Sequence, residues 1–147
     1  MIELTLILGL FVFATLLVPN AGEDVMLQNI LNKTAPQNKT LKLFKNNITP
    51  AETDTAATYT EADFTGYVAT TLAGAGWTIT PGAPTEAVFA EQSFTSSAGA
   101  QSQNVYGYYV IEATSGFIQW AERFTNGPYL IQNNGDVIKV TPKFTGE

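Results

Sequence analysis

Two pairs of closely spaced carboxylates are the best candidates in this sequence for a metal-binding or catalytic motif. Glu52 and Asp54 form one pair, and Glu61 and Asp63 form the other, within a single polar stretch. Paired carboxylates bind Ca²⁺ or perform acid–base catalysis in other proteins. A calcium loop places more oxygen ligands at tighter spacing and has a glycine at its turn, which this stretch lacks. We therefore interpret the two pairs as exposed loop acids.

The chain of 147 residues contains no histidine and no cysteine. This composition removes the usual zinc ligands, the usual general base and every standard catalytic triad. The sequence also has no glycine-rich phosphate loop, and no nucleophile stands beside a base. We predict that the protein is not an enzyme, and we assign no catalytic, cofactor-binding or metal-ligating residue and no cofactor.

Aromatic side chains offer a second kind of candidate site. Tyr106, Tyr108, Tyr109 and Trp120 could form a platform on which a carbohydrate stacks. The predicted strands that carry them have apolar residues on both faces, which is typical of central strands covered on both sides. We expect these rings to lie in the core or in a subunit interface. Three N-x-T sequons, which matter only for export in a glycosylating cell, begin at Asn32, Asn38 and Asn47.

The charges are few and unevenly distributed. The net charge of −6 argues against binding to a nucleic-acid backbone. Four of the seven basic residues lie close together, at Lys33, Lys39, Lys42 and Lys45. The stretch 46–122 then has no Lys or Arg but carries Glu52, Asp54, Glu61, Asp63, Glu86, Glu91, Glu112 and Glu122. Either these acids form a solvated face, or the basic strip of one subunit meets the acidic residues of its neighbour.

Secondary-structure signals place one short helix before a series of strands. The stretch 19–33 (PNAGEDVMLQNILNK) predicts an amphipathic helix, capped by Asn20 with Glu23 in capping-box spacing. From residue 40 the apolar period changes to two, and turn signals recur at close spacing. This pattern predicts strands at 40–46, 66–72, 76–80 and 86–95, a polar loop at 48–64 and another loop at 96–104.

Two hairpins are predicted in the second half of the chain. The first spans 104–124 and turns at ATSG, and the second spans 128–144 and turns at Asn134-Gly135. Pro142 fits an edge strand or a strand end. About seven or eight short strands predict a mainly β protein, an antiparallel β-sandwich or jelly-roll-like domain with a short N-terminal helix and a hydrophobic N-terminal arm.

Alternation assigns the side chains of these strands to two faces. Leu41 and Leu43 share one face, opposite Lys42 and Phe44. The remaining predicted groups are Tyr106, Tyr108 and Val110 against Tyr109 and Ile111; Ile118, Trp120 and Phe124 against Phe117, Ala121 and Arg123; and Ile138, Val140 and Phe144 against Lys139, Thr141 and Lys143.

The N-terminal segment is the most hydrophobic part of the chain. Leu4 to Val18 provides fifteen residues, fewer than the ~20 that a spanning helix needs. A secretory signal has a positively charged residue before its apolar run, and this segment has none. We divide the chain into a hydrophobic extension, 1–18, and a single β-sandwich domain, 19–147. We expect residues 1–13 to make an assembly contact.

Four segments carry a resemblance to a known class of protein. They are ATLLVPNAGEDVMLQNIL (14–31), LKLFKNNITPAETDTAATYTEADFTGYVATTL (41–72), YGYYVIEATSGFIQWAERF (106–124) and VIKVTPKF (137–144). Together they resemble small virion proteins of tailed bacteriophages, of the capsid decoration or cement type. The resemblance covers about residues 14–147 in the same order. Residues 1–13 look like an extension relative to that pattern.

The resemblance implies a structural, non-enzymatic role. The protein would bind the major capsid protein as a homotrimer on the capsid exterior, after assembly in the bacterial host cytoplasm, with no nucleic acid and no membrane as partner. Decoration would stabilise the shell by binding the assembled state and not its dissociated parts. Two alternatives remain open: a tail- or fibre-associated virion component, and an exported β-domain that binds glycan through its aromatic residues.

Overall fold

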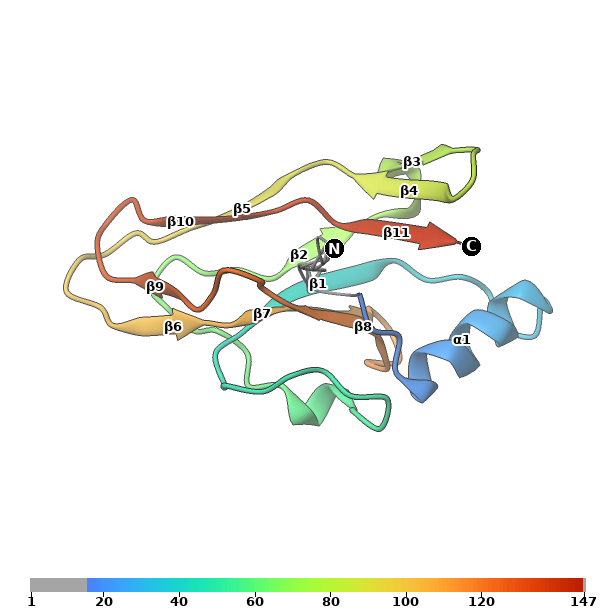
Figure 1. Ribbon diagram of the computed structural model, residues 1–147, viewed down its shortest axis with the longest axis horizontal. Helices are drawn as coiled ribbons and strands as arrows, with labels where there is room; N and C mark the ends of the chain where they lie inside the picture. Colours follow the sequence, from blue (N-terminus) through green and yellow to red (C-terminus); the bar gives the residue numbers. More distant parts are fainter. Residues whose placement is uncertain (1–15, 147) are drawn as a thin grey trace, which may run out of the picture.

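The computed structural model describes residues 16–146, and this part of the chain is mainly β (Figure 1). Its one α-helix is α1 (Asn20–Ile30). Its strands are β1 (Lys39–Phe44), β2 (Thr70–Leu72), β3 (Trp77–Thr80), β4 (Thr85–Phe89), β5 (Gln92–Thr95), β6 (Gln103–Val105), β7 (Gly107–Glu112), β8 (Ile118–Arg123), β9 (Tyr129–Ile131), β10 (Val137–Val140) and β11 (Lys143–Gly146). The predicted fold class, mainly antiparallel β with a short N-terminal helix, is confirmed, whereas residues 1–15 of the predicted hydrophobic arm, with the assembly contact expected of 1–13, lie outside the described residues.

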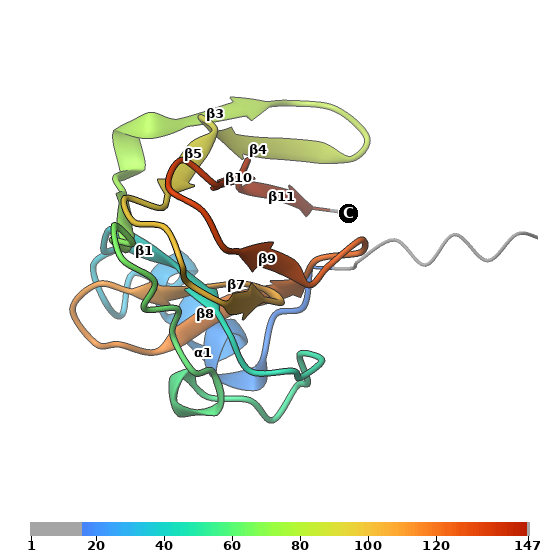
Figure 2. The same cartoon turned by 90° about the vertical axis from the view of Figure 1, so that its left-hand side faces the viewer.

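The strands form two layers, as Figure 2 shows. One layer is the antiparallel sheet β2-β1-β7-β8. The other contains the three-stranded sheet β11-β4-β3 and the pair β10-β5, and the short pair β6-β9 lies at one end. α1 packs on the outer side of β8, away from the second layer (Figure 2). The arrangement is sandwich-like, but the strand order does not establish a jelly roll.

β1 and β7 lie at the centre of the first layer and are covered on both faces. Leu41 and Leu43 point into the main core between the layers, which is the largest cluster of buried apolar side chains. Phe44 points to the opposite face, where it packs with Tyr59 and Tyr109 in a second cluster. The two faces predicted for this strand are confirmed, and Phe44 shows why alternation alone does not mark a solvent side.

A β-bulge in β8 changes part of the predicted face assignment. Val110 pairs with Trp120, but Ile111 pairs with Ile118, so that Gln119 has no counterpart in β7. The extra residue sends Ile118 to the second cluster while Trp120 stays in the main core. The prediction that Ile118 and Trp120 share a face is therefore wrong.

Tyr106 also departs from its predicted face. It packs against the second cluster, whereas Tyr108 and Val110 belong to the main core. Tyr106 lies between β6 and β7, so the strict alternation of a continuous strand does not apply to it. The other assignments within β7, β10 and β11 agree with the burial that the structure shows.

Two predicted strands are each broken in two at facing positions. The stretch 86–95 divides into β4 and β5, and the last strand of the predicted hairpin 128–144 divides into β10 and β11. β4 pairs with β11 and β5 with β10, with a one-residue change of register between the two pairs. Pro142 stands at this change of register, because it has no N–H to donate and only its carbonyl bonds, to Phe89 N. Its predicted place at a strand end is confirmed.

The predicted hairpin at 128–144 is wrong, although its turn is present. Gly135 has φ +90°, as a tight turn requires. The strands on either side have different partners, since β9 pairs with β6 and β10 pairs with β5. The β5–β10 ladder continues through the bond from Ser96 N to Asp136 O, and this long-range pairing replaces the local one. The predicted loop 96–104 likewise ends inside β6.

The predicted helix is confirmed, but its cap is not Asn20. Pro19 occupies the N-cap position, and its carbonyl accepts hydrogen bonds from Gly22 N and Glu23 N. Asn20 N donates to the carbonyl of Glu52 at 3.0 Å. The backbone N–H of Asn20, which the sequence assigned to a local capping box, is therefore bonded by a distant loop.

Gly22 sets the distance between α1 and β8. A Cβ atom at this position would lie 2.3 Å from the carbonyl oxygen of Gln119, the bulge residue. In an exposed helix the change from Gly to Ala would stabilise by about 1 kcal/mol. We expect Gly22→Ala instead to lower the free energy of unfolding by about 1–3 kcal/mol, because α1 must move off the sheet. Gly74→Ala is the control, since nothing lies within 4 Å of its added Cβ. Urea denaturation measures both, and a stabilised Gly22→Ala would contradict this packing.

Asp136 holds the turn between β9 and β10 through its ionised carboxylate. Its Oδ2 accepts hydrogen bonds from Asn133 N and Gln132 N, both at 2.7 Å, and these bonds lower the pKa of the carboxyl. Such a group stabilises the fold above its unfolded pKa and loses the effect as the pH falls. We expect Asp136→Ala to have a lower Tm than wild type at pH 7, with the gap narrowing below about pH 4. A gap that does not change with pH would contradict the assignment.

Candidate functional site

The basic strip of β1 is paired with acids of the same chain. Lys42 Nζ lies 2.8 Å from Glu61 Oε2, and Lys45 Nζ lies 2.6 Å from Asp63 Oδ2. Lys39 Nζ lies 3.4 Å from Glu112 Oε1. The charge complementarity that the sequence left open between subunits is therefore found within one subunit. Contact with Lys45 also lowers the pKa of the Asp63 carboxyl.

The segment that carries Glu61 and Asp63 lies beside the second half of β1, which β2 does not reach. Glu61 forms an isolated bridge with Phe44, and Ala62 N donates to the carbonyl of Leu43. Tyr67 OH accepts a hydrogen bond from Leu43 N at 3.0 Å and donates to Glu61 Oε1 at 3.1 Å. These contacts satisfy backbone groups that β2 is too short to reach.

The other acid pair closes a separate loop. Asp54 Oδ2 accepts hydrogen bonds from Ala51 N at 2.9 Å and from Tyr59 OH at 2.7 Å. Glu52 is exposed and contributes its backbone carbonyl to α1. Within residues 16–146 no group of three or more acids, histidines or cysteines is placed to hold a metal ion. The structure does not bring the two pairs together into one site.

Most remaining cations are also engaged. Lys139 pairs with Glu91 at 2.8 Å, a contact that raises the lysine pKa, and Lys143 pairs with Glu86. The Arg123 guanidinium donates to the carbonyl of Ile48 and to the Asn47 side chain, over the ring of Tyr106. Among the Lys and Arg residues of the described part of the chain, only Lys33 has no ion pair and no side-chain hydrogen bond.

Three of the four aromatic residues considered for glycan stacking lie in the core, and Tyr106 is partly buried against the second cluster. Tyr108, Tyr109 and Trp120 are buried, so they present no open face to a sugar, and the expectation of core aromatics is confirmed. Tyr108 OH donates to Glu122 Oε2 at 2.6 Å. The ring of Tyr109 stacks on Tyr59, and burial raises the Tyr109 pKa to about 12.

A cleft that the sequence did not reveal lies between α1 and the turn joining β7 to β8. Its volume is about 350 Å³. Glu112 is one of its lining residues and is buried. The cleft is lined by Val25, Gln28, Thr34, Ala35, Gln37, Glu112, Thr114, Ser115 and Phe117. These residues come from three separate segments, which explains why spacing along the chain did not indicate the cleft.

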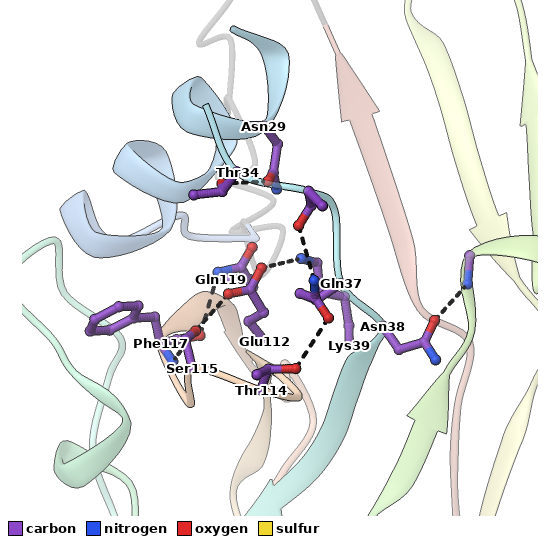
Figure 3. A network of polar contacts seen from close by, with 12 residues as sticks. Asn29, Thr34, Gln37, Asn38, Lys39, Glu112, Thr114, Ser115, Phe117 and Gln119 are labelled. Carbon is purple, nitrogen blue, oxygen red and sulfur yellow. Dashed lines mark hydrogen bonds and ion pairs between the residues drawn. The ribbon is translucent and has the colours of Figure 1, made fainter. Parts of the chain in front are cut away.

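A polar network fixes the walls of this cleft (Figure 3). Ser115 Oγ donates to Glu112 Oε2 at 2.6 Å, while Lys39 contacts the other carboxylate oxygen. Thr114 Oγ1 donates to Gln37 Oε1 at 3.1 Å and so joins the turn to the segment that follows α1. Both oxygens of Glu112 and the hydroxyl of Ser115 are thus occupied by protein partners, and the network braces the turn.

Beside the cleft, α1 presents apolar side chains to solvent. Leu27, Ile30 and Leu31 are 58%, 78% and 73% exposed. Their i, i+3 and i+4 spacing places them on one face, opposite the buried Gly22 and Val25. The sequence predicted an amphipathic helix, and the structure shows that its apolar residues are divided between a buried and an exposed face. Phe117, across the cleft, is also exposed.

Two comparisons of the chain with known proteins found no match. No family model matches the chain, and no curated protein matches it either. Within residues 16–146 there is no helix of the length and apolar character needed to cross a membrane. The functional interpretation therefore depends on the residues themselves.

The polar network around Glu112 can be tested through its contribution to stability. Glu112→Gln removes the charge that partners the largely buried Lys39. We expect the free energy of unfolding to fall by about 1–3 kcal/mol, because a buried cation loses its charged acceptor. Glu23→Gln, in the first turn of α1 and exposed, is the control and should change stability little. Thermal denaturation measures both, and equal stabilities would show that the network does not brace the fold.

Proposed function

We propose that this protein is a structural, non-enzymatic virion component that decorates the capsid of a tailed bacteriophage and bridges subunits of the major capsid protein. It acts as a homotrimer on the capsid exterior, after assembly in the host cytoplasm. Nucleic acid and membrane are not its partners.

The observation that carries the proposal is the contrast between paired polar groups and exposed apolar ones. The carboxylates and cations that could do chemistry are largely occupied by one another within the fold. Large apolar side chains are exposed at Leu27, Ile30, Leu31, Phe117, Val68 and Ile79. Exposed apolar groups contribute to binding when a partner buries them, which is how structural proteins associate.

The resemblance to decoration proteins supports the same role. The segments that carry it include α1, β1, the loop that follows β1, the β7–β8 hairpin and β10. They supply the first layer of the fold, the second cluster of aromatic residues and the exposed face of α1. The resemblance therefore covers both the core and the surface that the proposal uses.

The charge distribution favours a protein partner over nucleic acid. Binding to phosphates uses unpaired Lys and Arg side chains that release counterions. In this fold five lysines pair with carboxylates, and Arg123 donates to Ile48 and Asn47. The net charge of −6 would also repel a phosphate backbone.

Quantitative mass spectrometry of purified particles tests the proposal. We expect the chain in a copy number on the scale of the major capsid protein, because a decoration protein occupies repeated positions on the shell. Removal of the protein should lower the temperature at which the shell dissociates, since binding stabilises only the assembled state. A copy number at the level of tail components, or absence from the particle, would overturn the proposal.

A further inference from the structure

The exposed face of α1 lacks a partner within the described part of its own chain. Leu27, Ile30 and Leu31, which we call the α1 outer face, project away from the sheet that α1 packs on. The helix itself stands at one end of the molecule (Figure 1). Single exposed leucines are common on proteins, but three large apolar residues on one helix face mark an interaction surface.

We propose that the α1 outer face binds the apolar segment Leu4–Phe13 of a second copy of this chain. The segment has the right chemistry, because it is uncharged and consists mainly of Leu, Ile, Val and Phe. The outer face is likewise uncharged over its three apolar residues. Burying the segment against the outer face would remove the apolar side chains of both from water.

The direction of the chain at Leu17 indicates a second copy rather than the same one. Leu17 and Ala121 form an antiparallel bridge, with both backbone hydrogen bonds at 2.9 Å. Because the pairing is antiparallel, the chain running back from Leu17 to Leu16 heads toward the Arg123 end of β8. α1 lies against Gln119, nearer the opposite end of β8. At Leu17 and Leu16, the first described residues, the backbone is thus directed away from the α1 outer face of its own subunit.

The length of the segment allows it to reach a neighbour. Ten extended residues span at most about 35 Å, which exceeds the radius of a domain of this size. A reciprocal exchange of such segments closes a ring or a dimer without leaving either apolar surface exposed. The association depends only on this chain, so it holds for the isolated protein whether or not it binds a capsid.

Cysteine cross-linking tests the proposed contact directly, because the chain has no cysteine of its own. One preparation carries Leu8→Cys, and a second, distinguished by isotope labelling, carries Ile30→Cys. We expect mild oxidation of the mixture to give the mixed disulfide dimer as the main product. Val68→Cys is the matched control for Ile30→Cys, since Val68 is 74% exposed but lies outside α1. It should cross-link to Leu8→Cys only at the background level.

A chain carrying both substitutions separates the two possible sources of the segment. Disulfides between copies support the proposal, whereas disulfides within single chains at high dilution would overturn it in favour of the chain's own segment. A yield no higher than that of the Val68→Cys control would overturn it as well.

Charge substitution adds a test that does not depend on oxidation. We expect Ile30→Glu to weaken self-association by about tenfold or more in analytical ultracentrifugation, because a carboxylate would be buried against apolar side chains. Val68→Glu should leave association unchanged. Circular dichroism verifies that both variants fold. A wild-type chain that stays monomeric, or an Ile30→Glu variant that associates like wild type, would contradict the proposal.

Discussion

The burial of β1 on both faces is the constraint on which the rest of the structure depends. Leu41 and Leu43 fill the main core, and Phe44 fills the second cluster on the other side. A strand that is covered on both faces needs a partner for every backbone group, since water does not reach it. β7 supplies one edge along the full length of β1, and β2 followed by the 60–67 segment supplies the other.

The same strand explains why Glu61 and Glu112 are engaged in ion pairs within the fold. The two lysines of the strand, Lys39 and Lys42, would be costly to bury alone, and each lies beside an acid from a neighbouring segment. Glu61 and Glu112 therefore stabilise the fold through these ion pairs. Large apolar side chains remain exposed for contact with other molecules, and those on α1 and the turn beside it form one group of them. Pairing of the charges within the fold and exposure of apolar side chains together favour a binding role for the protein.

The sequence predicted those features that depend on local pattern. Alternation in β1 placed Leu41 and Phe44 on opposite faces, and the turn at ATSG placed β7 beside β8. It failed where long-range pairing decides the outcome: the Gly135 turn is present, yet β10 pairs with β5 and not with β9. The bulge at Gln119 was missed because alternation assumes an uninterrupted ladder, and the cleft beside Glu112 was missed because it joins residues far apart in the chain. The exposed α1 face was missed because periodicity does not say which apolar residues a sheet covers.

Hydrogen–deuterium exchange of the isolated protein tests the central role of β1 most directly. If β1 and β7 are the doubly covered centre of the fold, their amides exchange only when the whole domain unfolds, and their opening free energy equals the global value. The short pair β6-β9 should exchange much faster. Exchange of the β1 amides at the rate of β6 and β9 would contradict the account.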